Sequence, residues 1–282
     1  MTIDKNIILT RDGKKPILID AFYSNEIDNQ PIVIFCHGYK GFKDWGSWNL
    51  MAETFSKLGF CFIKFNFSHN GGTMENPIDF PDLDAFGNNN YTKELDDLAD
   101  IITWVKDHFK AHSKINTKHI TLIGHSRGGG ISILKAAEDD RITNLITLAS
   151  VSDFAKRTAT IGNLEAWKHN GVTYIVNGRT KQQMPHYYQF YQDFIIHKAR
   201  LDIESATKRL SIPHLIIHGS NDTSVKLEEG KALHKWNSNS ELKIINNADH
   251  VFNTKHPWDK DQLTTALLET INACVAFLQK QN

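Results

Sequence analysis

One short stretch constrains the fold of this chain more than any other. Residues 120–123 form an apolar run typical of strands, the residues Gly-His-Ser-Arg-Gly follow at 124–128, and residues 131–138 suit a helix. A Gly-x-Ser-x-Gly turn between a strand and a helix indicates a nucleophile elbow. The two glycines remove side chains that would collide with neighbouring elements, so the hydroxyl of Ser126 stands at the edge of a sheet. An ordinary glycine-rich turn is the alternative.

The charge balance and the cysteines limit the classes of function. Among 282 residues, lysine plus arginine and aspartate plus glutamate number 32 each. This balance does not favour binding to nucleic acid or to an acidic membrane surface, so we expect a small neutral or weakly charged substrate. No apolar run approaches a membrane span, and the N-terminus lacks a signal-peptide pattern. Cys36, Cys61 and Cys274 lie in apolar runs, which favours buried free thiols and a cytoplasmic location.

Strand-type and helix-type patterns alternate along most of the chain. We expect an edge hairpin at 7–9 and 17–22, buried strands at 31–36, 60–65, 120–123, 145–149, 213–219 and 242–245, and helices at 48–58, 91–111, 226–236 and 261–279. Alternating strands and helices predict an α/β fold with a mostly parallel central sheet flanked by helices.

Residues 150–211 interrupt this alternation without a sheet-type run. The segment is far longer than an ordinary connection of about 2–6 residues, so we expect an inserted cap on a core formed by 1–149 and 212–282. Helices are expected at 164–168 and 187–198. Its aromatic residues either line a substrate pocket or form the small core of the cap, and we take Tyr174, Tyr187 and Tyr191 as candidates for substrate contact.

A serine nucleophile needs a base and an acid that orients the base. His250 follows the strand at 242–245, and Asp222 follows the strand at 213–219. Ser126, Asp222 and His250 therefore occur in the order Ser, Asp, His, each just past a predicted strand. Because ligands bind at the carboxyl ends of strands in open α/β sheets, these three residues are the predicted catalytic triad.

Three other residues are weaker candidates. Asp249 adjoins His250, but neighbours on a tight loop rarely point at one another. His256 precedes Pro257 and Trp258, which suggests packing near the final helix. His125 should face away from the elbow as a hydrogen-bonded histidine between sheet and helix.

The oxyanion of the reaction needs two backbone donors. We expect one from the amide of Arg127, directly after Ser126, and one from the amide of Tyr39, in the loop after the strand at 31–36. His37, in that loop, and Val225, after Asp222, are further candidates for substrate contact.

Metal and nucleotide motifs find no support in the sequence. His108 and His112 are spaced for one helix face but lack the glutamate of a His-Glu-x-x-His motif, and His214 and His218 lie on a predicted strand. No glycine-rich phosphate loop occurs. We therefore expect no metal and no cofactor.

Together these residues resemble the α/β-hydrolase superfamily. The resemblance covers nearly the whole chain and rests on His-Gly at 37–38, the pentapeptide at 124–128, His-Gly-Ser-Asn-Asp at 218–222 and Asp-His at 249–250. It is nearest to the branch of feruloyl or cinnamoyl esterases and serine aminopeptidase-like hydrolases, which carry an inserted cap. Asn66 and Ser68 depart from the Asp-x-x-Gly-His-Gly pattern usual in that branch, so substrate preference does not transfer.

The resemblance implies hydrolysis through an acyl-enzyme on Ser126, with no cofactor. We expect a carboxylesterase that acts on small esters, aryl and cinnamoyl esters among them, as a monomer or homodimer. One alternative is a thioesterase, and another is a serine peptidase or acyl-peptide hydrolase, which would need an acidic anchor such as Asp153, Glu165 or Asp193. A catalytically silent binding protein is the non-enzymatic alternative.

Overall fold

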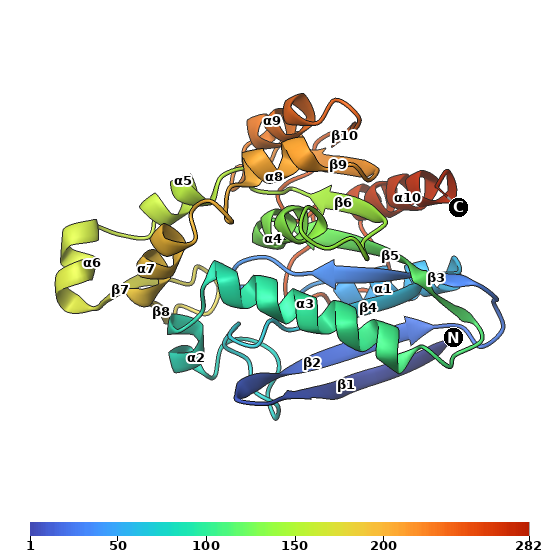
Figure 1. Cartoon of the computed structure of the whole chain (residues 1–282), viewed down its shortest axis with the longest axis horizontal. Coiled ribbons are helices and arrows are strands. Elements are labelled where there is room, and N and C mark those ends of the chain that lie inside the picture. The colour runs from blue at the N-terminus through green and yellow to red at the C-terminus, as the bar shows by residue number, and fades with distance from the viewer. Residues whose placement is uncertain (282) are drawn as a thin grey trace.

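A twisted sheet of eight strands forms the centre of the computed structural model, which describes residues 1–281 (Figure 1). In spatial order the strands are β1 (Thr2–Arg11), β2 (Lys14–Tyr23), β4 (Cys61–Phe65), β3 (Gln30–Cys36), β5 (Ile115–His125), β6 (Asn144–Leu148), β9 (His214–Gly219) and β10 (Glu241–Ile245). β2 pairs antiparallel with β1 and β4, and all other neighbours are parallel. The predicted edge hairpin and mostly parallel sheet are confirmed.

Both faces of the inner strands are buried, which explains their continuous apolar runs. In β3, Ile32 and Ile34 belong to one hydrophobic core, whereas Val33 and Phe35 belong to the other. Successive side chains of a strand point to opposite faces, so a strand between two helical layers needs apolar residues at every position.

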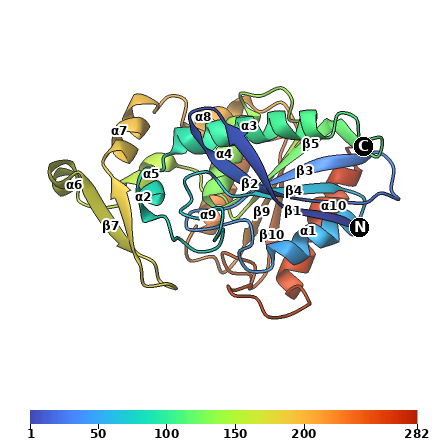
Figure 2. The same cartoon turned by 90° about the horizontal axis from the view of Figure 1, so that it is seen from below.

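Helices cover the two faces. The first core contains side chains of α3 (Tyr91–His108), α4 (Arg127–Ala136), α8 (Ile203–Arg209) and α9 (Leu227–Trp236), and the second those of α1 (Trp48–Lys57) and α10 (Thr265–Gln279). Figure 2 shows α3 on one side of the sheet and α1 and α10 on the other. The helix expected over 91–111 ends at His108, and the one expected over 261–279 begins at Thr265.

The segment between β6 and β9 differs from the expectation in one respect. It holds α5 (Phe154–Ala159), α6 (Leu164–Asn170), α7 (Gln189–Ile196) and α8, but also an antiparallel hairpin of β7 (Val172–Val176) and β8 (Gln183–Tyr187). The expectation that 150–211 lacks strands was therefore wrong, and the helix expected from Tyr187 begins at Gln189. The hairpin and α6 project at one end of the molecule (Figure 1).

Packing against a neighbouring loop stabilises this hairpin. Met184 of β8 is fully buried in a small third core with Phe42, Phe80 and Phe86. Phe86 belongs to α2 (Leu83–Gly87), a short helix in the connection between β4 and α3. A two-stranded hairpin is only marginally stable alone, so this contact with the main body supplies the burial that it needs.

Two expectations from composition concern the whole chain. Cys36, Cys61 and Cys274 are buried free thiols, as predicted. Among residues 1–281, no helix has the length and apolar character that crossing a membrane requires.

Candidate functional site

Ser126 lies at the junction of β5 and α4 in a strained conformation. Its φ is +56° and its ψ is −118°, a region that residues with a Cβ rarely adopt. Backbone hydrogen bonds hold it there: Ser126 donates to the carbonyl of Leu148 at 2.9 Å and accepts from the amides of Gly129 at 3.0 Å and Val151 at 3.3 Å. The hydroxyl is therefore presented by a rigid turn.

The glycines on either side of Ser126 are required by close packing. A Cβ on Gly124 would lie 2.3 Å from the carbonyl oxygen of Gly128, and a Cβ on Gly128 would lie 2.4 Å from that of Cys36. Both distances are far below van der Waals contact, so only glycine fits at either position. The spacing of the pentapeptide thus follows from the tight strand-to-helix turn.

A continuous chain of hydrogen bonds connects Ser126 with His250 and Asp222. The Nε2 atom of His250 lies 3.0 Å from Ser126 Oγ, and its Nδ1 atom lies 2.8 Å from Asp222 Oδ2. Because a carboxylate accepts, Nδ1 carries the proton and Nε2 is free to accept from the serine hydroxyl. The predicted residues meet in the predicted pairing, which is the arrangement that activates a serine.

Asp222 is held in its ionised form. Burial alone would raise the pKa of this carboxyl, but hydrogen bonds from His218 and His250 hold the pKa well below its usual range. Its other oxygen accepts the backbone amide of Val225 at 2.9 Å. An ionised, fixed carboxylate orients the imidazole of His250 and stabilises it when it gains a proton.

The structure also places the three weaker candidates. Asp249 accepts the backbone amides of Val251 and Asn253 within its own loop and does not hydrogen-bond to the His250 ring. His256 accepts the amide of Gly46 and packs on Phe42 and Trp45, away from the Ser126 hydroxyl that a base would have to reach.

His125 is a buried, hydrogen-bonded histidine, as expected, and its hydrogen bond reaches the loop that carries His250. Its Nε2 atom lies 2.8 Å from the backbone oxygen of His250. Burial, reinforced by His250, lowers the pKa of His125 to about 3, so the ring is neutral. It rests against Trp48, with ring centroids 5.5 Å apart. The residue beside the serine thus supports the loop that carries the imidazole.

The loop after β3 lies against Ser126. A Cβ on Gly38 would lie 2.9 Å from Ser126 Cβ. The buried ring of His37 fixes the loop, because Nδ1 donates to the Gly38 carbonyl at 2.9 Å while Nε2 accepts the Phe67 amide at 3.2 Å. Burial lowers the pKa of His37 to about 4, which agrees with this neutral form. His37 is only 4% exposed, so its main contacts are with the loop.

Two backbone amides remain available beside Ser126. Among residues 1–281, neither the Tyr39 amide nor the Arg127 amide donates to a protein acceptor. Unused donors next to a nucleophile are the groups that could bind a developing oxyanion.

The Arg127 side chain is held between the core and the inserted segment. Its guanidinium lies 4.2 Å from the ring centroid of Tyr39, 5.2 Å from that of Tyr91 and 5.6 Å from that of Phe190, which belongs to α7. Its Nη1 atom lies 3.4 Å from a carboxylate oxygen of buried Glu94. The positive charge beside Ser126 is therefore both paired and enclosed by aromatic rings.

Two cavities meet at Ser126, of about 320 and 230 Å³. Both are lined by Tyr39, Lys40, Ser126 and His250. Phe154, Ile161 and Ile175 of the inserted segment line the larger cavity together with Val151 and Val225, which makes that wall apolar. Asn177 and Arg179 from the turn of the β7–β8 hairpin line the smaller one together with Trp45 and Trp48.

The sequence matches the family model described as the alpha/beta hydrolase fold over residues 31–204, more than half of the chain. The chain belongs to this family. No curated protein matches the sequence of this hydrolase.

Solved structures share the fold across the whole hydrolase. Est1E from Butyrivibrio proteoclasticus superposes with a TM-score of 0.72 at 18% identity and 99% coverage of both chains. The same protein with bound ferulic acid superposes with a TM-score of 0.69 at 19% identity and 98% coverage of both chains. The alpha/beta hydrolase GrgF from Penicillium sp. sh18 superposes with a TM-score of 0.69 at 18% identity and 99% coverage of both chains. At these identities the likeness establishes the fold.

Three tyrosines expected at the substrate are placed elsewhere in this hydrolase. Tyr174 is 57% exposed, because its neighbour on β7, Ile175, faces the cavity and successive strand residues face opposite sides. The Tyr187 hydroxyl donates to Asp84 at 2.8 Å. Tyr191 packs on Trp167 and Tyr188 in the core of the inserted segment. Of the remaining candidates, Val225 lines the larger cavity and His37 borders the smaller one.

Sequence reasoning missed Lys40, Phe154 and Ile175 at the cavities. Phe154 is one of many aromatic residues in the insertion, so composition does not single it out, and Lys40 directly follows Tyr39 in the loop that begins at His37. Residues 1–281 contain no group of three or more His, Cys, Asp or Glu placed to hold a metal ion.

Proposed function

We propose that this hydrolase is a serine carboxylesterase that cleaves small esters through an acyl-enzyme on Ser126. The observation that carries the proposal is the chain of hydrogen bonds from Asp222 through His250 to Ser126. The distance from Asp222 to His250 is 2.8 Å and that from His250 to Ser126 is 3.0 Å. Ser126 and His250 line two cavities.

Each residue then has a defined role. His250 Nε2 takes the proton of Ser126 Oγ as this oxygen attacks the ester carbonyl, and the imidazolium returns the proton to the departing alcohol. The amides of Tyr39 and Arg127 stabilise the oxyanion. Water then attacks the acyl-enzyme by the same route, and the carboxylic acid leaves. Asp222 keeps the imidazole oriented throughout.

The larger cavity favours an ester with an apolar or aromatic part. Its wall of Phe154, Ile161, Ile175 and Val225 offers contact surface but few hydrogen-bonding groups. Est1E, which shares the fold, binds ferulic acid, and this is consistent with an aromatic acyl part in the substrate of this hydrolase. Hydrolysis of a thioester would use the same residues, so thioesters are included in the substrate panel for comparison.

The peptidase alternative lacks the anchor that it requires. An aminopeptidase must bind a free amino terminus, and neither cavity is lined by an aspartate or glutamate among residues 1–281. Asp153 caps α5, Asp193 accepts the Thr92 hydroxyl at 2.6 Å, and Glu165 is exposed on α6. Esters are therefore favoured over aminoacyl amides.

The test combines a covalent probe with a substrate panel. A fluorophosphonate should label the wild-type protein on Ser126, and Ser126→Ala should not be labelled. The wild type should hydrolyse aryl esters far faster than aryl thioesters or aminoacyl anilides. Absence of labelling and of ester turnover in folded protein would refute the proposal, and faster turnover of amides would reassign the protein as a peptidase.

A further inference from the structure

The charges around the two cavities are strongly unbalanced. Four cationic side chains line the cavities, and no acidic one does among residues 1–281; the four are Lys40, Arg127, Arg157 and Arg179. The whole chain has a formal net charge of zero. The local excess of positive charge is therefore a property of the site.

Only Lys40 among these four lacks an acidic partner in the described part of the chain. The others are paired with carboxylates outside the cavities: Arg127 with Glu94, Arg157 with Glu229 and Arg179 with Asp79. The Lys40 ammonium lies 5.1 Å from the ring centroid of Tyr39 and makes no ion pair or hydrogen bond within residues 1–281.

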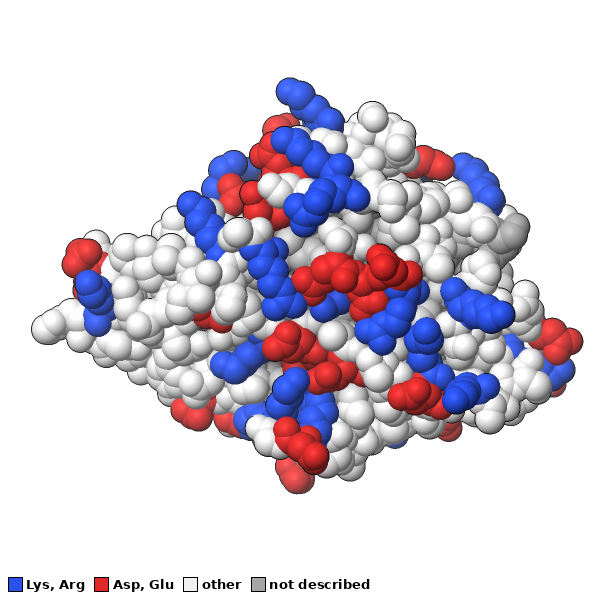
Figure 3. Space-filling view, in the orientation of Figure 1, with Lys and Arg blue, Asp and Glu red and all other residues white. Residues whose placement is uncertain are grey.

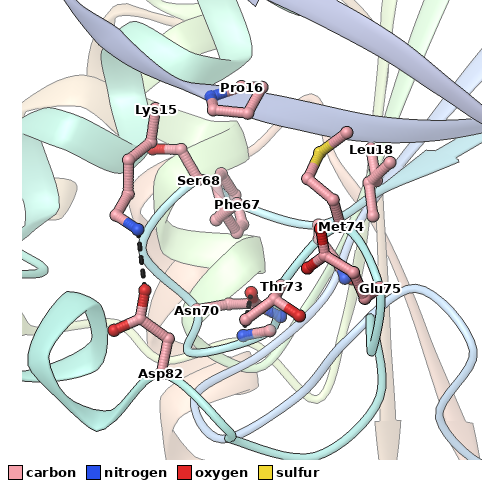
Figure 4. Close-up of a pocket in the computed structure, with 12 residues that line it drawn as sticks. Lys15, Pro16, Leu18, Phe67, Ser68, Asn70, Thr73, Met74, Glu75 and Asp82 are labelled. Carbon is pink, nitrogen blue, oxygen red and sulfur yellow. Dashed lines mark hydrogen bonds and ion pairs between the residues drawn. The ribbon is translucent and has the colours of Figure 1, made fainter.

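In the middle of the face seen in Figure 3, by contrast, blue and red side chains lie next to one another. A third cavity, shown in Figure 4, also contains a lysine, but there Lys15 Nζ lies 2.7 Å from Asp82 Oδ2. Lys198 lines a further cavity without an ion pair to any described residue, but it is exposed, whereas Lys40 is half-buried.

Partial burial makes the unpaired charge of Lys40 unfavourable. The side chain is half-buried, and burial together with the nearby Arg127 lowers the pKa of Lys40. A partly desolvated ammonium without a partner is destabilising until an anion binds to it. Because Lys40 follows Tyr39 directly and lines both cavities, that anion would lie close to the ester bond.

We propose that the substrate is an ester that carries an anionic group, such as a carboxylate, bound by the ammonium of Lys40. This inference rests on the proposed esterase function and specifies its substrate class. It narrows the expectation of a neutral or weakly charged substrate to a charged one, since the net charge of a chain says nothing about the charges that line one cavity.

Two matched pairs of esters test the proposal and locate the anion. In the first pair, 4-nitrophenyl butyrate is compared with 4-nitrophenyl hemisuccinate, whose acyl part carries a carboxylate. In the second, phenyl acetate is compared with 4-acetoxybenzoate, whose alcohol part carries it. In at least one pair the anionic ester should have a kcat/KM about tenfold higher at low salt, and added salt should reduce this preference.

Three variants assign the preference to Lys40. Lys40→Met should lower the ratio of anionic to neutral kcat/KM about tenfold or more, whereas Lys40→Arg should retain most of it. Lys156→Gln removes one charge from the inserted segment at a side chain that is 81% exposed and lines neither cavity. That variant should leave the ratio unchanged.

The outcomes separate this proposal from the esterase assignment. Equal or faster turnover of the neutral ester in both pairs, or an unchanged ratio in Lys40→Met, would overturn the role of Lys40 while leaving an esterase. If Lys40→Met does not fold, the wild-type preference and its salt dependence decide the matter. Failure of all four esters together with failure of fluorophosphonate labelling would overturn the esterase assignment itself.

Discussion

The imidazole Nε2 of His125 donates a hydrogen bond of 2.8 Å to the backbone carbonyl of His250. Two histidines 125 positions apart are thereby joined, one directly before the proposed nucleophile and the other the proposed base. Their ring centroids lie 4.9 Å apart. The position of the base therefore depends on a neutral, buried side chain that takes no part in proton transfer.

Replacing His125 should impair catalysis more than folding. His125→Phe keeps a ring against Trp48 but leaves the His250 carbonyl without its donor, so the loop can shift. We expect kcat/KM and the rate of fluorophosphonate labelling to fall about tenfold, as lost hydrogen bonds of this kind cost about 1–3 kcal/mol. His119→Phe, at a half-buried position near the middle of β5, is the control. A labelling rate equal to that of the wild type would show that the hydrogen bond is not needed for positioning.

The strained backbone of Ser126 predicts opposite effects on stability and activity. With φ at +56°, a Cβ at this position is unfavourable, and glycine would relieve the strain. Ser126→Gly should be more stable than Ser126→Ala by about 1 kcal/mol in urea unfolding. Both variants should be inactive. Equal stability of the two variants would mean that the turn holds Ser126 without strain.

A methyl group on Gly128 should disrupt the elbow. In Gly128→Ala the new Cβ would lie 2.4 Å from the Cys36 carbonyl oxygen and 2.5 Å from that of His37, so β3 and α4 must separate. We expect a loss of about 2 kcal/mol or more in unfolding free energy, with lower esterase activity. Gly178→Ala is the matched control, since a Cβ there meets nothing within 4 Å. Similar losses in both variants would contradict the packing argument.

Acid should destabilise the protein through Asp44. Burial would raise the pKa of this carboxyl, but Lys64 and Lys43 lower it well below its usual range, with ammonium to carboxylate distances of 2.6 Å. The unfolded chain therefore takes up a proton before the folded chain does, so this stabilisation is complete above about pH 5 and is lost as the pH falls.

The acid effect has a measurable size. Between pH 5 and pH 3, Asp44 should account for about 1 kcal/mol of the lost unfolding free energy. Asp44→Asn should be less stable at neutral pH but should lose less stability over this interval, as measured by urea unfolding at several pH values. The same pH dependence in both proteins would refute the argument.

Much of the fold and the meeting of Ser126, Asp222 and His250 could be predicted from the sequence. The buried parallel strands are short apolar runs, and each of these three residues follows one of them. Since parallel strands end at the same edge of a sheet, residues far apart in sequence can be placed together without knowing any side-chain contact.

The inserted segment could not be predicted in the same way. The strand at 172–176 has mostly half-exposed residues, and the strand at 183–187 contains Pro185, so neither shows the apolar run of a core strand. Without the hairpin, Tyr174 and Ile175 cannot be assigned to opposite faces. Lys40 could not be found from the sequence, because whether a lysine has an acidic partner depends on which carboxylates lie near it in space.

The enclosed guanidinium of Arg127 has a mechanical consequence. It rests on the ring of Tyr39 on one side of the site and reaches the ring of Phe190 in α7. The two amides proposed to hold the oxyanion belong to these same residues, Tyr39 and Arg127, so the inserted segment contacts the side chain of one donor residue directly and that of the other through the guanidinium. A displacement of α7 would therefore be felt first by the two residues that carry the donors.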